Sequence, residues 1–103
     1  MRGDLYAALV NGMLTAVTNI LKKDKDQLES IDAHTKMTPL MLAVRHKNLD
    51  IVRYLISLRA NTEASVGLAY RTKASLPRED DMEIMQKIIW ALEETGNSSP
   101  AGS

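Results

Sequence analysis

The sequence contains no cysteine, which excludes disulfides, thiolate metal sites and catalysis by a cysteine nucleophile. It also lacks an excess of charge, because 13 basic residues balance 13 acidic ones. Proteins that bind nucleic acids or membrane surfaces usually carry a basic excess, so neither class is favoured. No apolar run approaches the roughly 20 residues that a membrane-spanning helix needs. We therefore expect a cytoplasmic or nuclear protein that binds neither nucleic acid nor membrane.

The motifs of the common enzyme classes are absent as well. There is no glycine-rich phosphate loop and no His-Glu-x-x-His pattern. The two histidines, His34 and His46, fall on a predicted loop and at a predicted helix end. Neither histidine lies in a recognisable motif with a nucleophile, and the two histidines lack the close spacing that metal ligands show. We expect no enzymatic activity, no metal and no cofactor.

An internal repeat is the main signal that the sequence does contain. A shared spacing of apolar positions indicates stacked structural units. Four apolar residues recur at an offset of 35: Leu5, Ala8, Leu14 and Val17 in the first unit, and Leu40, Ala43, Leu49 and Val52 in the second. A looser third copy places residues 82–89 at an offset of 33 from residues 49–56. The predicted units are residues 1–28, 29–61 and 62–94, followed by a disordered tail at 95–103.

Each unit is predicted to be a pair of short antiparallel helices. In the middle unit, Thr38 caps the first helix and Pro39 occupies its first turn, where a missing N–H costs nothing. Breaks between the paired helices are predicted at Lys47-Asn48 and, in the first unit, at residues 11–12. Asp4 is expected to cap the first helix of the chain.

Only the second helix of the third unit is legible in the sequence. We expect it at Met82–Leu92, capped by Asp80 or Asp81. We also expect Met13, Met82 and Met85 to pack in the core, and Leu28 to be the one inward-facing residue of the charged connection that precedes the middle unit.

The motif TPLMLA at 38–43, followed by NLDIVRYLI at 48–56, resembles the ankyrin repeat. The resemblance implies an all-α fold: a short solenoid of stacked helix-turn-helix units with one or two hairpin fingers. Some positions depart from the family pattern. Met41 replaces the usual histidine, and the usual finger aspartate falls on Ala33, with Asp32 one residue early. Family glycine positions are occupied by Lys36, Lys47 and Arg59, where a left-handed backbone costs on the order of 1 kcal/mol each.

The resemblance also implies a non-enzymatic protein–protein interaction module. Its expected mechanism is docking of a partner protein in a concave groove between the finger loop and the first helices. The positions carried over are His34, Thr35, Met37, Arg45 and His46 in the middle unit, and Val10 and Asn11 in the first. Methionine and arginine are both enriched at protein contacts. The identity of the partner is not encoded, and we expect a monomer in isolation.

A second interpretation is a structural subunit or fragment whose array is completed by packing against another protein. The three replaced glycines and the missing third hairpin favour it. The apolar stripe around Met82–Leu92 would then need a partner to cover it.

Overall fold

The structure is a computed structural model that describes residues 1–96. Within these residues all regular secondary structure is helical. The elements are α1 (Gly3–Val10), α2 (Leu14–Lys23), the 3-10 helix η1 (Lys25–Glu29), α3 (Pro39–Arg45), α4 (Leu49–Ser57), α5 (Glu63–Ser75) and α6 (Glu79–Gly96). The middle helices begin and end within a residue or two of the positions that the Thr38 cap and the Lys47-Asn48 break predict.

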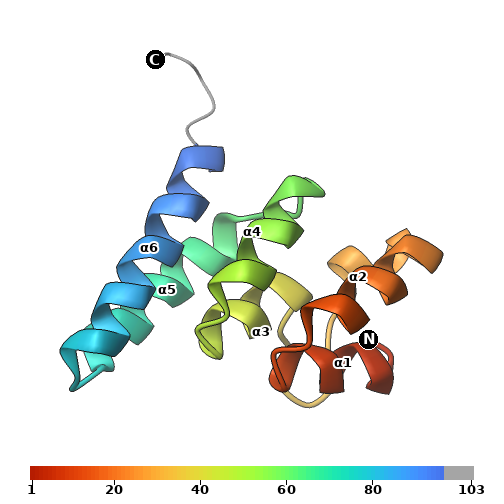
Figure 1. The fold of residues 1–103 in the computed structure, drawn as a ribbon, viewed down its shortest axis with the longest axis horizontal. Helices are drawn as coiled ribbons and strands as arrows, with labels where there is room; N and C mark the ends of the chain where they lie inside the picture. The colour runs from red at the N-terminus through yellow and green to blue at the C-terminus, as the bar shows by residue number, and fades with distance from the viewer. Residues whose placement is uncertain (97–103) are drawn as a thin grey trace.

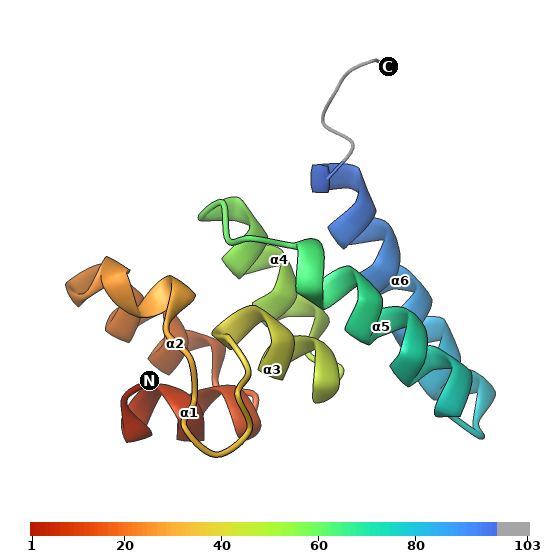
Figure 2. The same ribbon diagram turned by 180° about the vertical axis from the view of Figure 1, so that it is seen from behind.

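The helices form three pairs that stack side by side (Figure 1). α1 packs on α2, α3 on α4 and α5 on α6. Helices α1, α3 and α5 form an inner row, in which each contacts the next, and they can be followed in Figure 2. Helices α2, α4 and α6 form the outer row. The expected short all-α solenoid of stacked helix pairs is confirmed.

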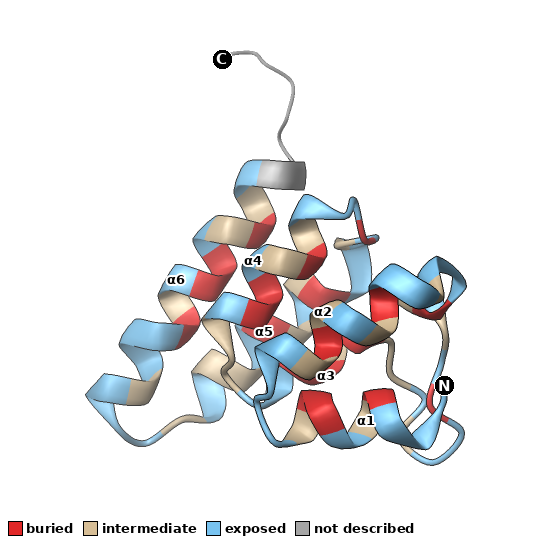
Figure 3. Ribbon diagram, turned by 45° about the vertical axis from the view of Figure 1, so that its right-hand side comes forward, coloured by how far each residue is buried: buried red, intermediate tan, exposed pale blue. Residues whose placement is uncertain are grey.

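The core follows the faces that the helices turn toward their neighbours (Figure 3). The buried hydrophobic residues are Leu5, Ala8, Leu9, Val17, Leu21, Leu40, Leu42, Ala43, Val44, Ile51, Val52, Leu55, Ala60, Ala69, Met85, Ile88, Ile89 and Leu92. Three of the four residues that recur at an offset of 35 are buried in both units. The fourth pair, Leu14 and Leu49, opens the outer helices and is more exposed, because a first-turn residue has core on one side only.

The third unit is more complete than the sequence predicts, because α5 supplies its first helix. Only Ser65 and Ala69 of α5 are buried, one helical turn apart. Two small side chains give no apolar stripe for a periodicity argument to detect. Their small size instead lets α5 lie close to α3 and α6, both of which it contacts.

Two helix starts differ from the prediction. α6 begins at Glu79, so Asp80 and Asp81 lie inside its first turn, where acidic residues face the positive end of the helix dipole, and neither caps it. α1 begins at Gly3 after Arg2, which places Asp4 inside the first turn as well. The Asp4 carboxylate accepts the Leu5 N–H at 2.9 Å. The prediction of a capping aspartate is therefore wrong at both places.

The predictions for the C-terminal tail and for the charged connection also need small corrections. Of the tail predicted at 95–103, residues 95–96 belong to α6 and the rest lies outside the described residues. In the charged connection, Leu28 does pack against the core, but Gln27 is buried too. The Gln27 side-chain oxygen accepts the Arg2 N–H at 3.3 Å, which satisfies its polar end.

The methionines divide differently from the expectation. Met85 is fully buried, as predicted. Met13 is 53% exposed and Met82 is 36% exposed, so the prediction that they pack in the core is wrong. Met13 directly precedes α2 and Met82 lies in the first turn of α6. At these ends of the outer helices, the neighbouring helices do not fully cover the side chain.

Three helices end in the same hydrogen-bond pattern, and each needs a left-handed residue. The residue after the cap has φ of 68° at Gly12, 59° at Lys47 and 67° at Arg59. Its N–H donates to the carbonyl three residues back, and the next N–H reaches five residues back, as from Asn48 to the carbonyl of Ala43. This is the Schellman arrangement, in which glycine is the preferred residue. The resemblance identified Lys47 and Arg59 correctly as family glycine positions.

Candidate interaction surface

The finger between η1 and α3 is a tight turn organised by Asp32. The Asp32 N–H donates to the Met37 carbonyl at 2.9 Å, and the Lys36 N–H donates to the Asp32 carbonyl at 2.8 Å. One carboxylate oxygen of Asp32 accepts the N–H groups of His34 (3.1 Å) and Thr35 (2.7 Å). Lys36 closes the turn with a φ of 61°. The turn therefore forms around Asp32, although the family pattern places its aspartate at residue 33.

The electrostatics of Asp32 follow from these bonds. The backbone N–H of Thr35, then the Thr35 hydroxyl and the His34 N–H, hold the pKa of the Asp32 carboxyl below its usual value, against the opposing effect of desolvation. The ionised carboxylate is thus the form that the turn stabilises. The sequence signal that could have found this role is the Asp-x-x-Thr spacing, which is typical of a side-chain-capped turn.

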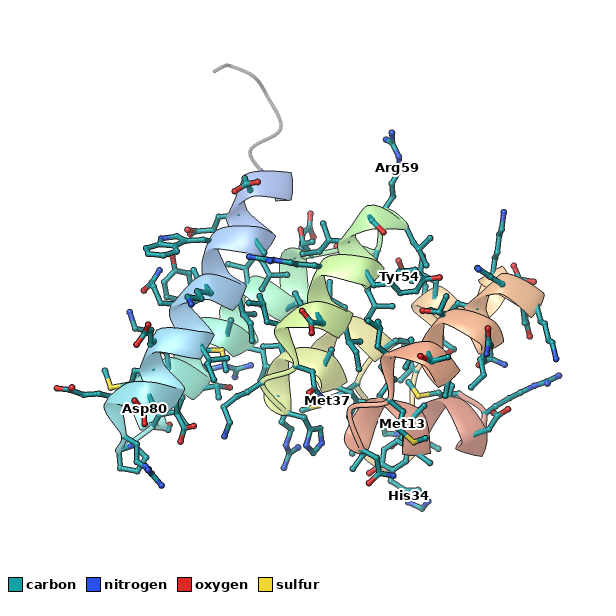
Figure 4. All side chains as sticks on the ribbon, in the orientation of Figure 1. Met13, His34, Met37, Tyr54, Arg59 and Asp80 are labelled. Carbon is teal, nitrogen blue, oxygen red and sulfur yellow. The ribbon has the colours of Figure 1, made fainter. Side chains whose placement is uncertain are left out.

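Three predicted contact residues lie on this finger in different environments. His34 is exposed at its tip and projects away from the helices (Figure 4). The Thr35 hydroxyl donates to Asp32 at 2.9 Å and accepts the Met37 N–H at 3.3 Å, so it is engaged within the turn. Met37 is half-buried and packs against the core. Met37, carried over as a contact position, is therefore only partly available to a partner.

The remaining predicted residues lie where the inner helices end. Arg45 is the last residue of α3 and His46 its C-cap, and both are exposed. Val10 and Asn11 occupy the same places on α1, with Val10 half-buried and Asn11 exposed. Figures 1 and 2 place the finger and these helix ends along one edge of the molecule.

The charge state of His46 depends on its neighbours on the chain. Partial burial lowers the pKa of His46, and the positive charges of Arg45 and Lys47 lower it further. The neutral imidazole is consequently favoured near pH 7 in the folded protein. This edge then carries the fixed positive charge of Arg45 beside an uncharged hydrogen-bonding ring.

Contacts between units fix the inner helix ends relative to one another. The Asn48 side-chain amide donates to the Leu9 carbonyl at 3.3 Å, which ties the turn after α3 to the end of α1. Gly12 faces the same side chain, since a β-carbon there would lie 3.0 Å from the Asn48 side-chain oxygen. Lys47 lies 4.0 Å from Asp81 and links the middle unit to α6.

Neither a membrane-spanning nor a metal-binding element emerges from the described chain. Among residues 1–96, no helix has both the length and the apolar character that crossing a bilayer requires. The same residues hold no group of three or more histidine or acidic side chains arranged to bind a metal ion.

Comparison with known proteins gives one family match. A family model described as ankyrin repeats, in three copies, matches residues 5–74, which extend from α1 to the last turn of α5. No curated protein and no solved structure matches the chain. The match includes α5, the helix that periodicity alone did not reveal, and stops before α6.

Proposed function

Because the chain belongs to the ankyrin repeat family, we propose that it is a non-enzymatic module that binds another protein through its finger and the ends of its inner helices. Ankyrin repeats generally mediate protein–protein interaction. The proposal concerns the edge of this array where the finger lies beside the ends of α1 and α3 (Figures 1 and 2).

The observation that carries the proposal is an exposed side chain on a turn that is already ordered. His34 extends from a tip whose backbone is held by several hydrogen bonds to Asp32. Binding to a preorganised loop costs less conformational entropy than binding that must first order the loop. The backbone that supports His34 is therefore suited to recognition.

The other residues of the surface divide into contacts and supports. Arg45, His46 and Asn11 are exposed and face the partner in this proposal, and arginine is enriched at protein contacts. Thr35 and Met37 mainly support the surface, because Thr35 is hydrogen-bonded within the turn and Met37 packs on the core. The surface is small, so we expect an interface at the low end of ordinary sizes.

The test is an affinity capture from cell lysate with the native chain and a variant carrying both His34→Glu and Arg45→Glu. Both side chains are exposed, so the variant should keep its helix content in circular dichroism. Lys22→Glu, an exposed change on α2, is the matched control. We expect a protein that the native and control chains retain and the double variant loses. Retention of the same protein by all three chains would refute the proposed surface.

The alternative of a structural subunit has less support. It requires an apolar stripe on α6 that another protein covers, yet Met85, Ile88, Ile89 and Leu92 are all fully buried within the chain itself. The alternative predicts that the isolated protein loses helix, whereas a self-contained module keeps it. Circular dichroism of the purified chain separates the two.

A further inference from the structure

The outer side of α6 exposes an aromatic side chain that the finger surface does not use. Trp90 is 59% exposed and is the only tryptophan in the sequence. Tryptophan is among the residues most enriched at the energetic centres of protein interfaces. An exposed tryptophan on an ordered helix therefore marks the outer side of α6 as a candidate interface.

Trp90 borders a groove between α4 and α6, which lie side by side in the outer row (Figure 1). A cleft of about 370 Å³ is lined by Arg53 and Ile56 of α4 and by Lys87, Trp90, Ala91 and Glu94 of α6. A second cleft of about 360 Å³ continues between the same helices toward the start of α4 and shares Lys87. The groove thus follows α6 over several turns.

The charges along this groove have a definite order. Lys87, Trp90, Ala91 and Glu94 are spaced i, i+3, i+4 and i+7, which places them on one stripe of α6. Lys87 and Glu94 are exposed, and the one ion pair within 4 Å among residues 1–96 joins other side chains. The stripe therefore has an unpaired positive end, an unpaired negative end, and Trp90 and Ala91 between them.

Such a stripe is complementary to itself when two copies run antiparallel. Lys87 of each copy then faces Glu94 of the other, and the indole of Trp90 lies over the small side chain of Ala91. From this geometry we propose that the chain self-associates as a two-fold symmetric dimer through the α4/α6 groove. In a two-fold interface every contact occurs twice, so each favourable pair is doubled. A parallel alignment would place like charges opposite each other.

The α4 side of the groove adds to this complementarity. Arg53 lines the same cleft as Lys87, so Glu94 of the second copy would lie near two cations. Ile56 lines that cleft as well and offers apolar contact to the incoming tryptophan. This dimer replaces the expectation of an isolated monomer. It leaves the finger edge free for another protein, because the groove belongs to the outer row.

The first measurement is sedimentation velocity of the native chain from about 1 µM to about 1 mM, the range expected for a small interface. The weight-average mass should rise from that of one chain toward that of two. Because Trp90 is the only tryptophan, its fluorescence emission should shift to shorter wavelength over the same concentrations as the indole leaves water.

Charge reversal at Lys87 and at Glu94 tests the proposed antiparallel pairing directly. Lys87→Glu and Glu94→Lys should each weaken self-association by about tenfold or more, because each places like charges opposite each other twice. An equimolar mixture of the two variants should associate again, since every contact in the mixed dimer then joins opposite charges. Lys22→Glu on α2 is the control and should leave the dissociation constant unchanged.

Any of the following results would overturn the proposal: a native chain that stays monomeric up to about 1 mM, a dimer that both reversals leave intact, or variants that fail to associate when mixed although circular dichroism shows them folded. Trp90→Ala should also abolish association. A dimer that persists without the tryptophan would place the contact on another face.

Discussion

Replacing Arg59 with glycine should stabilise the protein, although it removes a long side chain from its surface. Arg59 follows the cap of α4 with a φ of 67°, and its N–H donates to the Ile56 carbonyl at 2.8 Å. The side chain extends into solvent (Figure 4), and it makes no hydrogen bond or ion pair within the described residues. The substitution therefore acts almost entirely through the backbone.

The magnitude follows from two opposing effects. A left-handed backbone costs an ordinary residue roughly 1–2 kcal/mol, and glycine avoids that cost. Glycine also gains freedom in the unfolded chain, which offsets roughly 0.5–1 kcal/mol. We expect Arg59→Gly to raise the free energy of unfolding by about 0.5–1 kcal/mol. In a domain of this size, that raises Tm by about 2–8 °C. Lys47→Gly should gain less, because it also removes the ion pair with Asp81.

Urea unfolding followed by circular dichroism, with thermal melts at one fixed concentration, measures the change. Arg59→Ala is the matched control, because it removes the same side chain but keeps the β-carbon that the left-handed backbone disfavours. It should give no gain. If Arg59→Ala stabilises as much as Arg59→Gly, the effect comes from the side chain and the backbone argument fails.

Three further changes test other features. Ser65→Ala should raise the free energy of unfolding by about 1 kcal/mol in urea unfolding, because the fully buried Ser65 hydroxyl has no hydrogen-bond partner among the described residues; an exposed Ser75→Ala change should give no such gain. Asp32→Asn should destabilise the chain at pH 7. It should also remove part of the acid dependence of unfolding, because the lowered pKa of Asp32 gives stability that is present above the usual aspartate pKa and lost as pH falls through the lowered value. His46→Gln should flatten the stability profile measured by melts at about pH 7 to 5, because a histidine whose pKa is lowered on folding costs stability as pH falls through the unfolded value; a profile identical to that of the native chain would contradict it.

The middle unit was predictable because its sequence carries several independent signals. The Thr38 hydroxyl accepts the Met41 N–H at 3.3 Å, as the Thr-Pro start predicts, and the offset of 35 identified six of the buried core residues. The cap and the apolar spacing depend on local sequence, which a single chain records directly. The left-handed positions at Lys47 and Arg59 followed instead from the resemblance to the repeat family, because neither residue signals a positive φ by itself.

The third unit and the finger were harder because their determinants are not local. α5 is defined by where Ser65 and Ala69 let it approach other helices, and small residues carry no periodic signal. The partial burial of Met37 depends on the core beneath it, and no pattern in the finger itself reports that core. The role of Asp32 in the turn was not predicted, because the family pattern places its aspartate one residue later, at Ala33. A turn tolerates that shift of one residue if the carboxylate still reaches the same N–H groups.

The order in which the helices contact one another has a consequence for how the chain folds. The main helix contacts join partners within a pair or in adjacent pairs, so few of them require distant parts of the sequence to meet. The entropy lost on closing each loop is therefore small, and low contact order favours fast folding. Each pair can add to the one before it, so structure can spread along the chain from whichever unit forms first. The middle unit, which has a neighbour on both sides, should be the last to open.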